Sequence, residues 1–337
     1  MRIRMDGAFF LRATGLTLAE PKGVCAMPDE GKLNKPWLVA AWPGMGHVAV
    51  SAGYYLMAKL GMHLLAELNA PELFDVDYVE VKGGVIRPSR LPRSRFFVWR
   101  DPSGRHDLIV FIGEAQPPLG KYAFCRRLIE YAREHGVERV FTFAAMATQM
   151  HPSHDARVFG ASTDEEGLAE LKQHGLEIIE DGQIGGLNGV LLGAAAEGGL
   201  HGSCLLGEMP HIFAQLPFPK ASQAVLEAFA RMTGIEVDLA ELSEQAKEMD
   251  QRLGELLAQM EHAIGQQQMP PTEEEGVSEP VEEEPRLRPD DEQRIEELFE
   301  RAATDRSAAY ELKRELDRLD LYRDYEDRFL DLFKKSP

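Results

Sequence analysis

Short apolar runs alternate with amphipathic segments from residue 37 to residue 233, and this alternation is the main structural signal in the chain. Trp37 to Trp42 is continuously apolar between two prolines, which is typical of a strand covered on both faces. After a glycine turn, His47 to about Leu60 carries apolar residues three and four positions apart, which predicts a helix. Because such pairs recur, we expect an α/β fold with a mainly parallel sheet flanked by helices.

The remaining elements follow the same two periodicities. Further strands are expected over residues 8–11, 73–81, 96–99, 108–112, 140–145, 158–162, 177–180 and 202–206. Further helices are expected over 122–135 and 165–174, after Asn188, and after Ser222. The acidic residues of 73–81 fit a solvated strand face better than a metal cluster, and His151 and His154 lie in a loop with weak metal-ligand spacing. No metal site is expected.

The pattern changes after residue 238. From Leu239 to Ala263 apolar residues follow a 3-4 spacing, which fits either a coiled-coil seam or a helix packed along its own domain. Residues 265–289 are rich in Pro and Glu and predict a linker, and 290–337 predict a helical tail. We therefore divide the chain into an α/β domain (1–238), a heptad-patterned helix (239–264), the linker and the tail. The tail is too small to be stable alone, so it docks on the main domain, another subunit or a partner.

Charge and cysteine content narrow the functional classes. The chain has a net charge of −19, with 56 acidic and 37 basic residues, which argues against nucleic acid and anionic membrane as partners. Its three cysteines, Cys25, Cys125 and Cys204, lack the spacing of a disulfide framework or a zinc site. No apolar run is long enough for a signal peptide or a membrane span. A cytoplasmic location is expected.

The glycine turn after the first buried strand has two interpretations. Residues 44–49 fit the dinucleotide fingerprint G-x-G-x-x-A between a strand and a helix. The acidic residue expected about 20 positions later is matched only by Glu67, which Asn69 and Pro71 place outside a strand. We therefore expect no nucleotide cofactor.

Several polar residues follow the predicted strands, at the edge where open α/β sheets bind ligands. A crevice at this edge would be lined by Gly44, Gly46, His47, Glu114, Gln116, Thr148 and Asn188. The start of the helix at His47 would hold an anion, and Glu114 would act as an acid or base or accept a sugar hydroxyl. No catalytic set is recognisable, since the serines lack the G-x-S-x-G context.

Five short motifs, in order, resemble the PAC2 family of proteasome assembly chaperone 2-like proteins. They are Trp42–Gly46, Gly113–Pro117, Gly182–Gly189, Pro217–Ser222 and Thr233–Asp238. The resemblance covers residues 8 to about 264 and implies a phosphorylase/hydrolase-like α/β fold, homo-oligomers that are often trimers, and no established reaction. Family chaperones that dock on proteasome α-rings end in hydrophobic-Tyr-any residue, whereas this chain ends Lys335-Ser336-Pro337. Contact by the C-terminal helices is the other route to a partner.

Two functional hypotheses follow. The first is a non-enzymatic, homo-oligomeric scaffold or assembly-chaperone-like protein that contacts a protein partner through residues 239–337. The second is a phosphorylase/hydrolase-like enzyme, or a nucleotide- or nucleoside-binding protein, that uses the crevice. The lack of a catalytic set and the patterned C-terminal helices favour the first.

Overall fold

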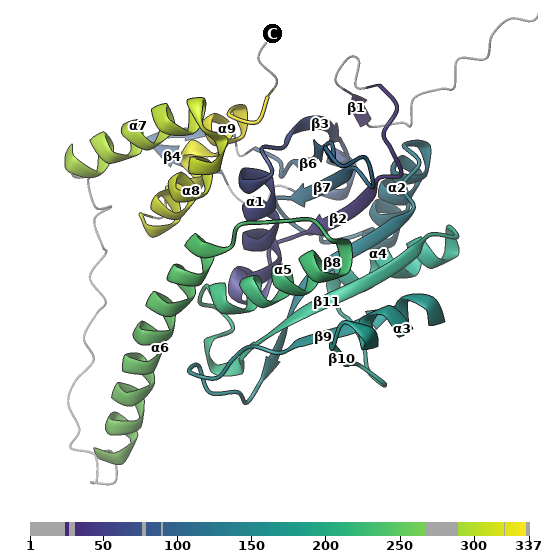
Figure 1. Ribbon diagram of the computed structural model, residues 1–337. Helices are drawn as coiled ribbons and strands as arrows, with labels where there is room; N and C mark the ends of the chain where they lie inside the picture. Colours follow the sequence, from purple (N-terminus) through teal and green to yellow (C-terminus); the bar gives the residue numbers. More distant parts are fainter. Residues whose placement is uncertain are drawn as a thin grey trace, which may run out of the picture.

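A nine-stranded sheet forms the centre of the computed structural model, which describes residues 24–26, 31–75, 79–88, 90–266, 289–319 and 321–334 (Figure 1). Its four middle strands are parallel and adjacent, in the order β7 (Leu108–Gly113), β2 (Trp37–Ala41), β8 (Arg139–Thr148) and β11 (His201–Pro210). All five residues of β2 are buried. The predicted α/β architecture, with a parallel core and flanking helices, is confirmed.

Antiparallel strands extend the sheet on both sides. On one side β7 is followed by β6 (Ser94–Trp99), β3 (His63–Leu68) and β1 (Val24–Ala26). On the other side β11 is followed by β9 (Val158–Ser162), which is antiparallel to it, and then by β10 (Glu177–Ile178). The predicted hairpin of β6 and β7 is therefore formed, whereas β3 was not predicted.

Helices cover both faces of the sheet, because side chains alternate along each strand. Val39 belongs to the core that contains α1 (Val48–Lys59) and α5 (Pro219–Thr233), together with the buried Leu171 of α3 (Glu165–Gln173). Leu38 and Ala40 belong to the opposite core, beneath α2 (Lys121–Glu134) and α4 (Gly186–Glu197).

The C-terminal helices form a further layer beside α1 and α5 (Figure 1). The long helix α6 packs on α5, and three shorter helices then gather near α1; their bounds are Ala240–Gln266 for α6, Pro289–Thr304 for α7, Ala309–Arg318 for α8 and Tyr322–Asp331 for α9. Among the helices in the described residues, none combines the length and apolar character needed to cross a bilayer.

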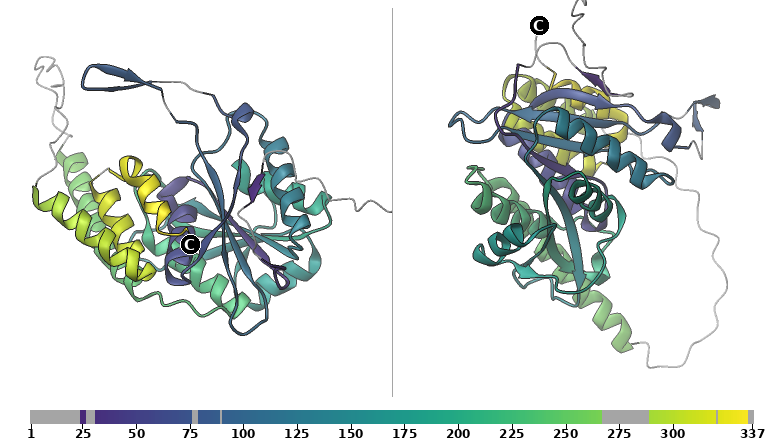
Figure 2. Two further views of the ribbon diagram at one scale, coloured as in Figure 1. Left: turned by 90° about the horizontal axis from the view of Figure 1, so that it is seen from above. Right: turned by 90° about the vertical axis from the view of Figure 1, so that its right-hand side faces the viewer.

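The expected strand over 73–81 is wrong for residues 73–75, and residues 76–78 lie outside the described part of the chain. Pro71–Leu73 form a short 3-10 helix, and the end of the range forms a strand, β4 (Glu80–Lys82). It pairs with β5 (Val85–Arg87) across a two-residue turn, and Figure 2 shows this hairpin projecting from the rest of the chain. The expected strand over 8–11 lies outside the described residues.

Candidate functional site

The predicted crevice residues come from separate elements that meet at one edge of the sheet. Gly44, Gly46 and His47 follow β2, Glu114 and Gln116 follow β7, and Thr148 is the last residue of β8. Because β2, β7 and β8 are parallel, their carboxyl ends share this edge. Asn188 lies in the first turn of α4.

Gly46 holds the turn after β2 in place by backbone contacts with the segment before α5. Its N–H donates to the carbonyl of Ala214 at 2.8 Å, and its carbonyl accepts from the N–H of Phe218 at 2.9 Å. Its φ of 60° is in the left-handed region, and an added Cβ would lie 2.7 Å from Sδ of Met209. The protein's own chain therefore occupies the close approach that the glycine permits.

Gln116 connects the two glycine-rich stretches. Its Nε2 donates to the carbonyl of Pro43 at 3.4 Å, and its Oε1 accepts from the N–H of Leu187 at 3.1 Å. The side-chain oxygen thus satisfies a free N–H at the start of α4, the kind of group that would otherwise bind an anion. Oδ1 of Asn188, in the same helical turn, is shielded from solvent and has no hydrogen-bond partner in the described part of the chain.

Glu114 is bound by arginines. Its carboxylate accepts from Arg90 Nη1 at 2.9 Å, from Arg95 Nη1 at 2.9 Å and from the backbone N–H of Arg93 at 2.7 Å. The side chain is only 12% exposed. These contacts satisfy the carboxylate within the fold, as expected for a structural ion-pair cluster.

Two carboxylates from α9 complete this cluster. Arg90 Nη2 contacts Glu326 at 2.5 Å, and Arg93 Nη1 contacts Asp327 at 2.7 Å. Burial and the negative charge of Glu114 raise the pKa of Glu326, while Arg90 acts in the opposite direction. Arg90, Arg93 and Arg95 therefore pair with the protein's own carboxylates, including two from the C-terminal helices.

Thr148 belongs to another buried ion-pair network. Its hydroxyl donates to Glu208 Oε1 at 2.7 Å, and Glu208 also accepts from Arg157 Nη2 at 2.6 Å. The hydrogen bond from Arg157 is the main reason that the pKa of Glu208 lies below its usual range. Sequence reasoning missed Glu208, although a carboxylate inside the otherwise apolar stretch 202–209 is a signal for a buried ion pair.

The predicted residues are thus brought to one edge but not into one cluster. Gln116 meets the turn at Gly44 and the start of α4, whereas Glu114 and Thr148 are held by different ion-pair networks. His47 is exposed at the start of α1 with a φ of 52°. No group of three potential metal ligands occurs among the described residues.

The C-terminal segment docks on α1 and on β3. Tyr322 Oη donates to Tyr54 Oη at 2.7 Å, and the N–H of Leu64 donates to the carbonyl of Phe333 at 2.8 Å. Nine of the twelve residues of α1 are buried. The apolar character of nearly the whole circumference of α1 was the signal for a second covering layer. The tail was expected to dock on the main domain, on another subunit or on a partner, and in the structure it docks on the main domain.

The heptad seam of α6 is divided between two environments. Leu242, Ala246 and Leu253 are buried, and the helix packs on α5, where Lys220 Nζ contacts Asp250 at 2.6 Å. About one turn further on, Leu256 is 38% exposed. Figure 1 shows the end of α6 extending beyond the body. The first half of the seam thus packs along its own domain.

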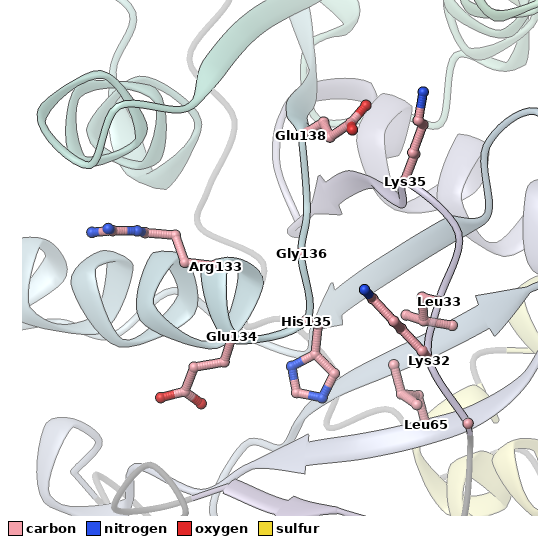
Figure 3. A pocket seen from close by; sticks show the side chains of 10 residues that line it. Lys32, Leu33, Lys35, Leu65, Arg133, Glu134, His135, Gly136 and Glu138 are labelled. Atoms are coloured by element: carbon pink, nitrogen blue, oxygen red, sulfur yellow. The ribbon is translucent and has the colours of Figure 1, made fainter. Parts of the chain in front are cut away.

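A cavity of about 560 Å³ lies at the opposite edge of the sheet. It is bounded by the segment before β2, the end of α2 and the segment before β8, and none of the predicted crevice residues lines it. Figure 3 shows Lys32 and His135 projecting into the space between these elements, while Arg133 points away. His135 Nδ1 is 2.9 Å from the carbonyl of Tyr131, so the ring is held by its own helix.

Comparison with known proteins gives consistent matches. The model described as PAC2 family matches residues 38–257. An uncharacterised protein of Methanocaldococcus jannaschii is 29% identical over 251 residues, covering 73% of this chain and 93% of its own. The crystal structure of Pyrococcus furiosus PbaB, an archaeal proteasome activator, is similar with a TM-score of 0.60 at 27% identity, covering 70% of this chain and 99% of PbaB. Pyrococcus furiosus PbaA, an archaeal homolog of proteasome-assembly chaperone, gives a TM-score of 0.55 at 26% identity, covering 73% and 97%.

Proposed function

This chain belongs to the PAC2 family, and we propose that it is a non-enzymatic, homo-oligomeric assembly-chaperone-like protein that contacts a protein partner through its C-terminal helices. PbaB is an archaeal proteasome activator and PbaA is an archaeal homolog of proteasome-assembly chaperone, so the partner we propose is a multi-subunit assembly of that kind. We further propose that the protein works in the cytoplasm, where the two buried free thiols of Cys125 and Cys204 remain reduced.

The pairing of Glu114 carries the non-enzymatic part of the proposal. A general acid or base must reach the reacting group with its carboxyl available. Glu114 accepts one backbone and at least two arginine hydrogen bonds. The hydroxyl of Thr148 is likewise used within the fold, since it donates to Glu208. These contacts support a role for both residues in holding the edge of the sheet together.

We place the contact with a partner on the surface of the C-terminal helices that does not pack against the α/β domain. The inner faces of α7–α9 are used within the chain, since Leu298, Leu312 and Phe329 are buried. The outer end of α6, with Leu256 exposed, is available. Residues 265–337 carry 22 acidic and 12 basic side chains, so a partner with a basic surface would suit this part of the chain.

Crosslinking and affinity capture from the native cell test this function. We expect the tagged full-length chain to recover, in fixed ratio, the subunits of one multi-subunit assembly. Leu256→Asp should lower the recovery at least tenfold, and Gln251→Asp on an exposed position of the same helix should not. Recovery of that assembly at equal levels with both variants would contradict the role of α6.

A second candidate function is the binding of a nucleotide or nucleoside by Gly44, Gly46, His47 and Asn188, with Glu114, Gln116 and Thr148 supporting the edge. The unpaired Oδ1 of Asn188 at the start of α4 favours it. Titration of the protein with AMP and adenosine in a calorimeter tests it. Saturable heat that Asn188→Ala abolishes would support the site, and the absence of heat at millimolar ligand would exclude these ligands.

A further inference from the structure

The β4–β5 hairpin, here called the arm, is a separate two-stranded sheet. Gly83 and Gly84 form its turn with φ of 60° and 77°, which suits a tight two-residue hairpin loop. The arm pairs with no other strand among the described residues, and Figure 2 shows it standing clear of the body. A two-stranded hairpin is at best marginally stable in water unless another surface covers it.

The two faces of the arm differ in character. Val81 lies opposite Ile86 in the strand register, so the two side chains share one face. Val79 comes directly before β4, two residues from Val81. These three side chains are between 51% and 68% exposed. The opposite face carries Val85 and Arg87. An uncovered apolar face on a small sheet is typical of a surface that packs against another chain.

A second uncovered apolar surface, here called the patch, lies beside the glycine turn after β2. It consists of Met45, Ile212 and Leu216, which are 44%, 47% and 39% exposed. The backbone hydrogen bonds of Gly46 with Ala214 and Phe218 hold the two segments of the patch side by side.

The patch is also free of strongly charged side chains. Residues 43–47 and 209–219 contain no Asp, Glu, Lys or Arg, in a sequence in which 28% of residues are charged. The centre of a protein interface is depleted in charge in the same way, because burying an unpaired charge is costly. The arm and the patch together hold seven of the ten exposed large apolar side chains in the described part of the chain.

The segment that follows the arm is bound to the body and to the C-terminal helices. Arg90, three residues after β5, is bound to both Glu114 and Glu326, and Arg93 is bound to Asp327. These contacts anchor the segment between the arm and β6 to the end of β7 and to α9. Figure 2 shows the arm beyond this anchor, standing clear of the body.

We propose that the face of the arm that carries Val81 and Ile86 packs on the Met45–Ile212–Leu216 patch of a second copy of this chain. The inference rests on the proposed homo-oligomer and identifies its contact surfaces. Because arm and patch are different surfaces, the contact is head to tail, and repetition of it closes a ring when the rotation between copies permits. The arm of one copy would then cover the edge at Gly44 and His47 of the next.

Two exposed-site variants and their mixture test the contact. The arm variant carries Val81→Glu and Ile86→Glu, the patch variant carries Ile212→Glu and Leu216→Glu, and Val85→Glu on the other face of the arm is the control. Light scattering after size exclusion should give a multiple of 37.7 kDa for the wild type and the control, and one chain for each of the two variants. A mixture of the arm and patch variants should form a 1:1 dimer, since it retains one intact arm and one intact patch.

The results that would contradict the proposed homo-oligomer differ from those that would contradict the contact between arm and patch alone. A wild-type protein of 37.7 kDa at micromolar concentration would overturn the proposed homo-oligomer together with this contact. An oligomeric wild type whose mass survives in the arm variant would overturn the arm contact alone. Loss of the oligomer in the arm variant but not in the patch variant would show that arms pair with each other and would also overturn it. All five positions are exposed, and unchanged circular dichroism confirms that the variants fold.

Discussion

Arg90 and Glu326 are 236 positions apart in the sequence, yet the guanidinium of one binds the carboxylate of the other at 2.5 Å. The same guanidinium binds Glu114 through its other terminal nitrogen. This contact joins the end of β7, the root of the β4–β5 arm and the last helix. Glu114, which the sequence placed in a crevice as a possible acid or base, thus lies in the junction between the α/β body and its C-terminal helices.

Replacing Arg90 should destabilise this junction. In Arg90→Ala, Glu114 keeps Arg95 but Glu326 loses its arginine while remaining mostly buried. Since Arg90 is itself 36% exposed, we expect a loss of about 1–3 kcal/mol in the free energy of unfolding. Urea denaturation measures it, and Arg126→Ala in an exposed pair should cost less than about 0.5 kcal/mol. Equal effects of the two substitutions would contradict the account.

The stability of the junction should depend on pH through Glu326. Its pKa is raised in the folded protein, so the folded state binds this proton more tightly than the unfolded state. The contribution of Glu326 to stability is therefore complete below the unfolded pKa of 4.5 and is lost as the pH rises through the folded pKa. As the pH rises from 4.5 to 7, the wild type should therefore lose stability relative to Glu326→Gln, which has no carboxylate to titrate at this position. A difference that stays constant would show that Glu326 does not titrate in this way.

Glu208 should show the opposite pH dependence. Its pKa is lowered in the fold, mainly by the hydrogen bond from Arg157, so its stabilising effect is present above the unfolded pKa and is lost as the pH falls through the folded pKa. Glu208→Gln should cost about 1–3 kcal/mol at pH 7 because the carboxylate is buried and bound to Arg157. Urea unfolding at pH 7 and pH 3 measures the cost. A cost that is as large at pH 3 would contradict the assigned cause.

The docking of the C-terminal helices can be measured separately from global unfolding. Phe333 is fully buried and packs on Phe97. Phe333→Ala should weaken the docked state by about 3–5 kcal/mol, the usual cost of removing a buried aromatic ring. Hydrogen exchange should then become faster throughout α7–α9 and on α1, with no change in β8 or β11. Uniform acceleration over the whole chain would show that these helices do not open as a unit.

The two glycines of the turn after β2 provide a matched pair. Gly46 has a left-handed φ of 60° and lies against Met209, so Gly46→Ala should lower the melting temperature, with a cost of at least about 1–2 kcal/mol. Gly44 has an extended φ of −168° and no atom within 4 Å of an added Cβ, so Gly44→Ala should have little effect. Thermal unfolding compares them. A larger loss in Gly44→Ala would reverse the assigned roles.

Sequence patterns predicted the parallel core because its strands are apolar throughout and its helices are amphipathic. They did not predict β3, and Glu67 was wrongly placed outside a strand, because Asn69 and Pro71 follow immediately after the strand ends at Leu68. In the structure, Glu67 lies on β3, which pairs with β6 and β1 rather than with β2, and its carboxylate binds Arg95. It therefore does not occupy the place of the acidic residue in a dinucleotide fold.

The environment of the crevice residues could not be predicted from local sequence. The turns after β2 and β7 were located correctly because Gly and Pro mark them. The partners of Glu114 and Thr148 lie 19 to 60 positions away, and ion pairs over such separations leave no periodic signal. The docking of α9 on Tyr54 was not predicted, because the apolar circumference of α1 indicates a covering layer but does not identify the helix that provides it.

In the function proposed here, the chain promotes the assembly of a partner complex without catalysing a reaction. The most direct test adds the purified protein to the separated subunits of the complex that it captures, without nucleotide, and follows assembly by native mass measurement. We predict a higher rate or yield with the wild type, and little increase with Leu256→Asp. Assembly that proceeds equally well with and without the wild-type protein would contradict the proposed function.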